Sequence, residues 1–202
     1  MEDENVWDAE IRKAAIQMPR GLRLVMCDVD CGSETPSMVK KVLAWRSSSK
    51  QEADAIWNEL QKGNEKLAAE LTRLAERQVV AEDYNVLREI ILSNRKLIRQ
   101  MGEQSGVPIE PPQQTKLLNH CSELEGVVGG VVPGAGGFDA IVLLVEDKEE
   151  VITTLKTALG QYMDSDAVEG MKIGRVGIIG VREEMVGVRK EELSLYSDWE
   201  TS

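Results

Sequence analysis

The sequence predicts an α+β domain with the split β-α-β order of a ferredoxin-like sandwich and extra helices inserted in its first crossover. Short apolar runs at residues 22–29, 127–132, 140–145 and 173–181 are typical of buried strands. Amphipathic helical stretches fill the long interval after the first run and the shorter interval before the last one. The resulting order is strand, helices, strand, strand, helix, strand.

The first strand is entered through Gly21 and ends before Asp30. A helix is expected to begin at Thr35, because a hydroxyl side chain is a good N-cap and the Pro36 that follows suits the first helical position. This helix should run to about Arg46.

Two long helices are expected at residues 51–77 and 82–104, each with an apolar stripe at helical spacing, and Gly106 is placed to end the second one. The stripes favour an antiparallel helix pair within one chain. A coiled-coil dimer is the alternative, but neither stripe persists long enough to be typical of one.

Pro111 and Pro112 open a shorter helix that ends before Gly126. Residues 148–163 form the last amphipathic helix, and the strand at 173–181 is interrupted by glycines. We therefore expect an N-terminal extension at 1–20, one domain at 21–182 and a polar tail at 183–202.

The composition indicates a globular chain, with 42% apolar and 29% charged residues among 202. A net charge of −11 argues against nucleic acid or an anionic membrane surface as a partner, although a local basic pocket remains compatible with it. No signal peptide is expected at the N-terminus, and no apolar run is long enough to predict a transmembrane helix.

Three cysteines, Cys27, Cys31 and Cys121, are too few and too irregularly spaced for a disulfide framework. His120, the single histidine, lies beside Cys121, but further ligands for a metal are missing, so no metal site is expected. These features favour a reduced chain in the cytoplasm.

The strongest local signal is the sequence PGAGG at residues 133–137. Gly134, Gly136 and Gly137 allow positive φ, so that backbone amides, including that of Ala135, can converge on an anion. Asp139 could hydrogen-bond the loop or a ligand. The alternative is a tight connection between two antiparallel strands, where glycine is also expected.

A second candidate lies at the first strand–helix junction. Ser33 and Thr35 offer hydroxyl groups at a helix start, and Lys40 follows one turn later, which suits a phosphate or a carboxylate. The alternative is a plain N-cap with a surface lysine.

Three stretches resemble the C-terminal part of eukaryotic, and especially fungal, phosphomevalonate kinases of the GHMP kinase superfamily. They are CDVDCGSETPSMVKKVLAWR at 27–46, SGVPIEPPQQTKLLNHC at 105–121 and GVVGGVVPGAGGFDAIVLLV at 126–145, with a weaker match at GVRKE, 187–191.

The resemblance implies ATP-dependent phosphorylation of 5-phosphomevalonate in isoprenoid and sterol synthesis, and a ferredoxin-like domain. It implies that the glycine loop packs under the nucleotide phosphate loop. Residues 32–36 and 111–115, which include Gln114 and Thr115, would line the cleft between the two halves of such an enzyme.

The sequence also departs from the family's pattern. The serine- and glycine-rich ATP loop and the catalytic aspartate and lysine belong to the family's N-terminal half, and none of them is in these 202 residues. Phe138 stands where tyrosine is expected, and Asn119 where aspartate is expected. The chain is therefore expected to be inactive alone, and to use ATP and Mg²⁺ only beside an N-terminal half.

Two alternatives remain open from the sequence. The chain could be a stand-alone domain in a terpenoid pathway, either an enzyme or a binder of an isoprenoid-derived small molecule, or it could be an interaction module that uses its long helices. The expected partners are a phosphorylated mevalonate or related small molecule, an N-terminal kinase half, or a second copy of the chain.

Overall fold

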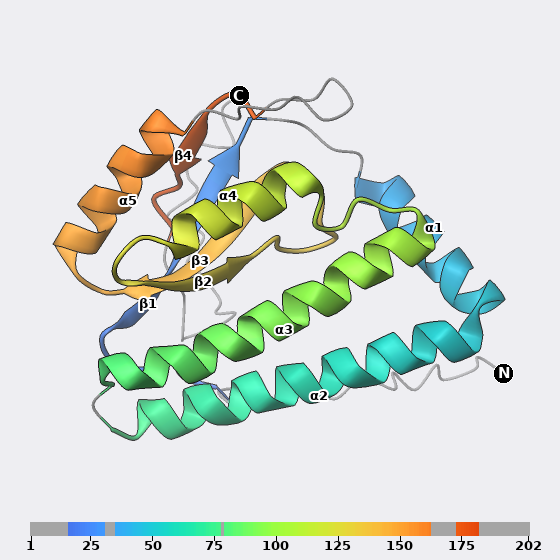
Figure 1. Ribbon diagram of the computed structural model, residues 1–202, viewed down its shortest axis with the longest axis horizontal. Helices are drawn as coiled ribbons and strands as arrows, with labels where there is room; N and C mark the ends of the chain where they lie inside the picture. The colour runs from blue at the N-terminus through green and yellow to red at the C-terminus, as the bar shows by residue number, and fades with distance from the viewer. Residues whose placement is uncertain (1–15, 31–34, 78, 163–172, 182–202) are drawn as a thin grey trace, which may run out of the picture.

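The computed structural model describes residues 16–30, 35–77, 79–162 and 173–181 and contains a single four-stranded sheet (Figure 1). The strands are β1 (Leu22–Val29), β2 (Val127–Val131), β3 (Ala140–Glu146) and β4 (Val176–Ile178). Their order is β2-β3-β1-β4, and every neighbouring pair is antiparallel. Because β3 lies between β1 and β2, the predicted split β-α-β order is confirmed.

The described residues form five helices beside this sheet: α1 (Thr35–Ser48), α2 (Lys50–Ala75), α3 (Ala81–Ser105), α4 (Pro112–Ser122) and α5 (Glu149–Gln161). The first four form the crossover from β1 to β2, as expected for the extra helices. Figure 1 shows α4 and α5 against one face of the sheet, while α2 and α3 run side by side along the β2 edge. Among the described residues, no helix is long and apolar enough to cross a membrane.

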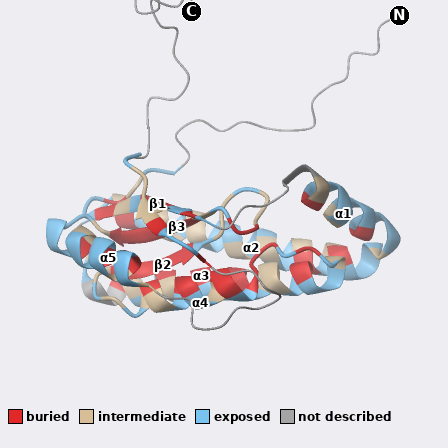
Figure 2. Cartoon of the chain, turned by 90° about the horizontal axis from the view of Figure 1, so that it is seen from above, coloured by how far each residue is buried: buried red, intermediate tan, exposed pale blue. Residues whose placement is uncertain are grey.

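The main core fills the space between the sheet and the α4–α5 layer. Alternate β1 residues Val25, Cys27 and Val29 point into it and meet Leu117 of α4 and Leu155 of α5. Figure 2 shows this buried layer between the sheet and helices that are exposed on their outer sides. Burial of these apolar side chains holds the helical layer on the sheet.

The helix pair α2–α3 is antiparallel within one chain, as the stripes predicted. Leu74 of α2 and Leu87 and Ile91 of α3 join Val128 and Leu144 of the sheet in a second core. Midway along the pair, a Cβ atom on Gly63 would lie 1.9 Å from the side-chain oxygen of Asn94, so a larger residue at position 63 would displace the Asn94 amide.

Two predictions on the last elements need correction. The strand expected at 173–181 forms regular pairs only at Val176–Ile178, which lie opposite Cys27–Val29. It is an edge strand, and the glycines at 174, 177 and 180 weaken it. The preceding helix ends at Gln161, because Tyr162, which was expected to belong to it, already has an extended backbone; Met163, the last residue expected in it, lies outside the described residues.

Gly130 provides a test of the packing between β2, β3 and α4. In Gly130→Ala, the new Cβ would lie 2.4 Å from Leu143 Cδ2 and 2.9 Å from Leu118 Cδ2, so the free energy of unfolding should fall by roughly 1–3 kcal/mol. The matched control is Gly177→Ala, where a Cβ meets no atom within 4 Å. Urea denaturation measures both, and equal midpoints for the two variants would contradict this packing.

Cys27 and Cys121 provide a second test. Burial raises the pKa of each thiol to about 12, and for Cys27 the nearby Cys121 adds to the shift. An unfolded thiol ionises near pH 9, so the unfolded state loses protons first between pH 9 and pH 12. Stability should therefore fall as pH rises through that window, by roughly 1 kcal/mol per thiol at pH 10.

The burial of the two thiols, on which this prediction rests, is measured by alkylation in a Cys31→Ser background, so that only Cys27 and Cys121 are counted. Iodoacetamide at pH 8 should alkylate them in urea and leave them largely unmodified in the folded chain. Equal alkylation rates in both conditions would show that the thiols are accessible and would overturn their placement in the core.

Candidate functional site

The two central strands bring two predicted site segments to one end of the sheet. Asp28 pairs with Ala140, and the Val29 amide donates a hydrogen bond to the Asp139 carbonyl at 2.8 Å. The chain therefore leaves β1 toward α1 next to the point where the glycine loop enters β3. Asp139 itself is exposed at this end.

The glycine loop has the positive-φ backbone that its sequence predicted. Gly134, Gly136 and Gly137 have φ values of 65°, 87° and 105°. The Gly136 amide donates to Pro133 O at 3.2 Å, and the Gly137 amide donates to Ile109 O at 2.9 Å. Within the described residues these bonds use two of the loop amides, and those of Gly134 and Ala135 make no backbone hydrogen bond.

The loop also packs directly against the backbone of residue 109. A Cβ on Gly136 would lie 2.4 Å from the Ile109 carbonyl oxygen and 2.6 Å from its Cα. Glycine is therefore required at position 136 both by φ and by space. The loop connects β2 to β3, and the backbone of Ile109 fixes its shape. Contact of the loop with a ligand stays a prediction.

Gln114 supports the same loop from α4. Its side chain is completely buried, and its Nε2 donates to the carbonyl of Phe138 at 2.7 Å. Its Oε1 is also buried and has no hydrogen-bond partner among the described residues. The structure thus places Gln114 behind the loop, and contact with a ligand stays a prediction.

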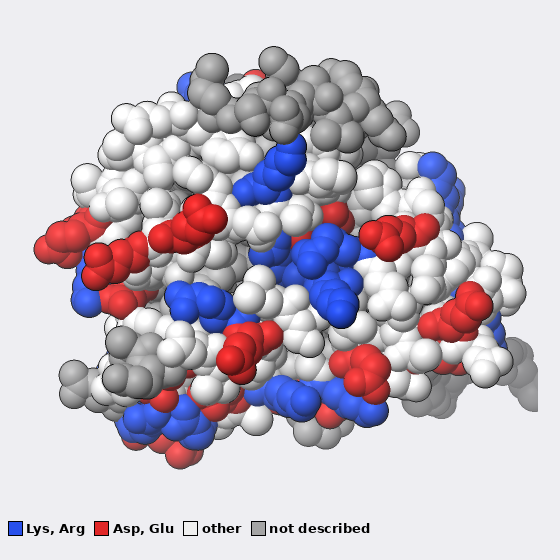
Figure 3. All heavy atoms as spheres, viewed as in Figure 1, with Lys and Arg blue, Asp and Glu red and all other residues white. Residues whose placement is uncertain are grey.

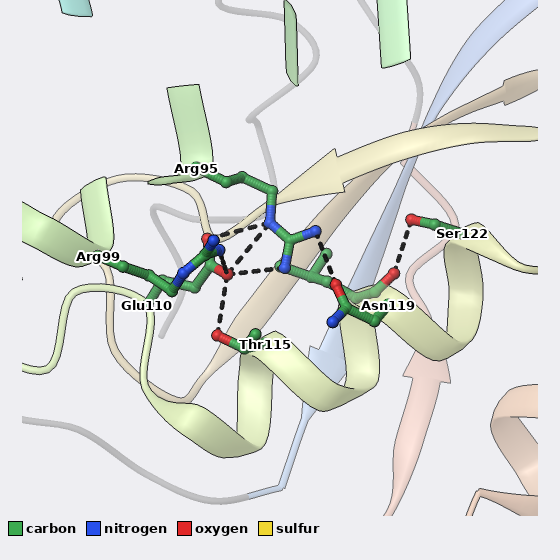
Figure 4. Close-up of polar contacts among 7 residues, drawn as sticks. Arg95, Arg99, Glu110, Thr115, Asn119 and Ser122 are labelled. Carbon is green, nitrogen blue, oxygen red and sulfur yellow. Dashed lines mark hydrogen bonds and ion pairs between the residues drawn. The ribbon is translucent and has the colours of Figure 1, made fainter. Parts of the chain in front are cut away.

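A buried ionic cluster holds the segment that anchors the loop (Figure 4). The Glu110 carboxylate accepts bonds from Arg95 Nη2 at 2.7 Å, Arg99 Nη1 at 2.8 Å and Thr115 Oγ1 at 2.9 Å. Arg95 Nε also reaches both carboxylate oxygens at 3.1 Å. The side chains of Arg95 and Glu110 are each only 1% exposed.

These charged residues were not among the candidates drawn from the sequence. Arg95 falls on the buried side of α3, near the apolar stripe that includes Ile91 and Ile98. A buried arginine usually has an acidic partner. The position of Arg95 beside this stripe was therefore the one feature of the sequence that could have indicated a buried ion pair. The acidic partner, Glu110, lies beyond the end of the helix, so helical spacing could not identify it.

The two departures from the resembling family lie beside this cluster. Asn119 Oδ1 accepts a hydrogen bond from Arg95 Nη1 at 3.2 Å, so a neutral amide occupies the position where a carboxylate was expected. Phe138 is buried and forms part of a pocket wall.

That pocket has a volume of about 670 Å³. Its walls come from the end of α3, the 106–112 segment, the start of α4 and Phe138, and Arg99 and Lys116 are its cationic residues. Figure 3 shows basic side chains gathered near the centre of the face that α3 and α4 form, flanked by acidic ones. A local basic region therefore exists in a chain whose net charge is −11.

The other residues predicted for the site lie in different parts of the structure. Lys40 is exposed on α1, and Thr115 belongs to the ionic cluster. Met38 of α1 and Ile109 share one core cluster, which places the start of α1 on the same segment that anchors the glycine loop. Ser33 and the Thr35 side chain lie outside the described residues. In the described ranges, no three acidic, histidine or cysteine side chains form a metal-binding group.

Comparison with known proteins identifies close relatives for nearly the whole chain. The phosphomevalonate kinase of Aspergillus fumigatus is 49% identical over 200 residues, which are 97% of this chain and 41% of that protein. The phosphomevalonate kinase of Gibberella zeae is 47% identical over 199 residues, which are 98% of this chain and 42% of that protein. The chain thus spans about two fifths of the length of these relatives.

The fold is shared with a solved kinase at much lower identity. The crystal structure of L. major mevalonate kinase in complex with R-mevalonate superposes with a TM-score of 0.55, covering 71% of this chain and 39% of that one. At 13% identity the likeness shows the fold alone.

The family comparison agrees with the sheet and helices described above. Residues 75–161, from the end of α2 to the end of α5, match the family described as GHMP kinases C terminal. This range contains the glycine loop, the ionic cluster and the pocket. Residues 75–161 therefore form a domain of the family GHMP kinases C terminal, and the chain as a whole is similar to the C-terminal part of the fungal phosphomevalonate kinases.

Proposed function

We propose that this chain is the C-terminal half of a phosphomevalonate kinase, which transfers a phosphoryl group from ATP to 5-phosphomevalonate beside an N-terminal half. The observation that carries the proposal is the glycine loop, held in a positive-φ conformation by Ile109 and Gln114 at the sheet end where α1 begins. The identity of 49% to a phosphomevalonate kinase over nearly the whole chain supports it.

The donor groups at this end suit phosphate. The amides of Gly134 and Ala135, with Lys40 and the hydroxyl groups of Ser33 and Thr35, would supply donors that stabilise phosphate oxygens. ATP would supply the phosphoryl group, and Mg²⁺ would neutralise part of its charge. In this proposal the chain's own task is to position an anion, which is a large part of phosphoryl-transfer catalysis.

An N-terminal half is the partner that fits the exposed apolar side chains at this end. Val39 and Leu43 lie one turn apart on α1 and are 46% and 52% exposed, and Val131 at the end of β2 is 39% exposed. Apolar groups of this kind on a free domain are typical of an interdomain contact. Self-association of the chain through the same residues is the competing outcome.

The domain limits expected from the sequence, 1–20, 21–182 and 183–202, are part of this proposal, as is the cytoplasmic location. The alternative functions, a stand-alone ligand-binding or enzymatic domain in a terpenoid pathway and an interaction module, predict behaviour that the following experiments distinguish.

The 202-residue chain by itself should give no measurable phosphorylation of 5-phosphomevalonate with Mg-ATP. Positioning and neutralising two phosphate groups requires more donors than one glycine loop supplies. Co-purification with the N-terminal half of the Aspergillus fumigatus kinase should restore turnover. A rate of about 1–100 per second from the chain alone would contradict the proposal.

Two glycine variants test whether the restored activity depends on the loop, and a third variant tests the contact with the N-terminal half. Gly136→Ala should abolish it, because the new Cβ would collide with Ile109 and displace the loop. Gly160→Ala, on α5 where a Cβ meets no atom within 4 Å, should retain it. Leu43→Ser should weaken association with the N-terminal half without lowering the melting temperature of the chain. Full activity of Gly136→Ala would remove the loop from the mechanism.

Anion binding should persist in the isolated chain. Titration with 5-phosphomevalonate should shift the Gly134 and Ala135 amide resonances with a dissociation constant on the order of millimolar, about −4 kcal/mol, because an open site is screened by solvent. The shifts should vanish in Thr35→Val and persist in Thr157→Val, a matched change at an exposed residue of α5. Silent loop amides with shifts elsewhere would mean that the loop is only a turn.

A further inference from the structure

β4 is the outermost strand on one side of the sheet, next to α5 (Figure 1). Toward β1, the Ile179 amide donates a hydrogen bond to the Met26 carbonyl at 2.8 Å. Backbone groups of an antiparallel strand point alternately to its two sides, so the N–H and C=O groups of Val176 and Ile178 face away from β1. Within the described residues no strand pairs with β4 on that side.

The sequence of β4 lacks the features that normally protect an outermost strand. Such strands carry charged side chains, proline or a bulge, which discourage pairing with another chain. Residues 176–181 read VGIIGV, without a charge or a proline. Val176 is buried and Ile178 is half-buried against the main core, which α5 also covers. β4 therefore has the composition of an inner strand, although it lies at the edge.

The part of the chain that follows β4 has the sequence of a strand that could return along it. Three charged residues, REE at 182–184, separate the apolar run of β4 from a second apolar run, MVGV at 185–188. Two such runs with a connection of this length are typical of a β-hairpin. With the turn centred on residue 183, Val188 lies opposite Ile178 and on the same side of the sheet, toward the core.

The residues after this second run also suit an outermost strand. They read RKEE at 189–192, and charges of this kind are the protection that β4 lacks. A connection of three residues keeps the segment next to β4 at a high effective concentration, which favours it over a second copy of the chain.

We propose that residues 185–190 pair with the outer side of β4 as a fifth antiparallel strand, so that the chain's own tail covers this edge. The sheet then extends beyond residue 182, the domain limit expected from the sequence. The inference rests on β4 and the residues that follow it, and it is independent of the proposed kinase activity.

The added strand has a consequence for the end of the sheet where α1 begins. The Asp30 amide donates to the Arg175 carbonyl at 2.9 Å, and the Gly174 amide donates to the Asp30 carbonyl at 3.1 Å. The residues that lead into β4 therefore hold the point at which the chain leaves β1. A β4 that is paired on both sides opens less often than an edge strand, so the tail stabilises this point as well.

Hydrogen exchange of the Ile178 amide in the full 202-residue chain tests the pairing. This amide faces the proposed strand and should be protected. Val188→Pro removes the opposing N–H and should speed its exchange at least about tenfold. Ser197→Pro, in the same tail but outside the proposed strand, should leave the exchange slow. An Ile178 amide that is unprotected in the original chain, or equally protected in Val188→Pro, would overturn the proposal.

A disulfide identifies what covers the edge. In a Cys31→Ser background, Gly177→Cys and Arg189→Cys lie opposite each other in the proposed register, and a Cβ at position 177 meets no atom within 4 Å. Mild oxidation should link the two within one chain. The control pair, Gly177→Cys with Tyr196→Cys, should react at least about tenfold more slowly. A disulfide between two chains would show that a second copy covers the edge, and it would overturn the proposal, as would equal rates for the two pairs.

Discussion

The buried pair of Arg95 and Glu110 is the interaction on which the site depends. Removing two charges from water is costly, and the cost is offset only when the geometry is good and the remaining donors and acceptors are satisfied. Here the carboxylate accepts hydrogen bonds from two arginines and a threonine, and Arg95 also donates a hydrogen bond to Asn119. Loss of one partner of such a pair typically costs about 3–5 kcal/mol, so the cluster strongly restricts where residue 110 can lie.

That restriction passes to the glycine loop through one residue. Ile109, next to Glu110, accepts the Gly137 amide bond and leaves no space for a side chain at position 136. Met38 of α1 packs in the same cluster as Ile109, and Gln114 holds the loop from α4. Elements far apart in the sequence therefore share one short segment, which fixes the shape of the glycine loop at this end of the sheet.

The charge distribution explains how an acidic protein can present such a site. The net charge of −11 opposes extended polyanions, because a nucleic acid or a membrane senses the whole surface. A small phosphate or carboxylate senses mainly the nearest groups, since exposed charges beyond roughly 10 Å are screened by salt. Backbone amides, Arg99 and Lys116 can thus attract a nearby anion even though the net charge of the protein is negative.

Periodicity and turn chemistry in the sequence were sufficient for the fold, because each element carries its own signal: alternation or an apolar run for a strand, a stripe for a helix, glycine or proline at the ends. They also placed the glycine loop, whereas the likeness to the relatives was carried by the resemblance of the stretches at 27–46, 105–121 and 126–145. They overestimated β4, whose length depends on pairing with Cys27–Val29, and they missed Glu110, Arg95 and Arg99. Those residues meet across 11 to 15 positions of sequence only because the chain turns back after α3. A contact of that kind has no local period, so the sequence determined the elements and their order, and only the tertiary structure decided which charges are buried together and what they hold in place.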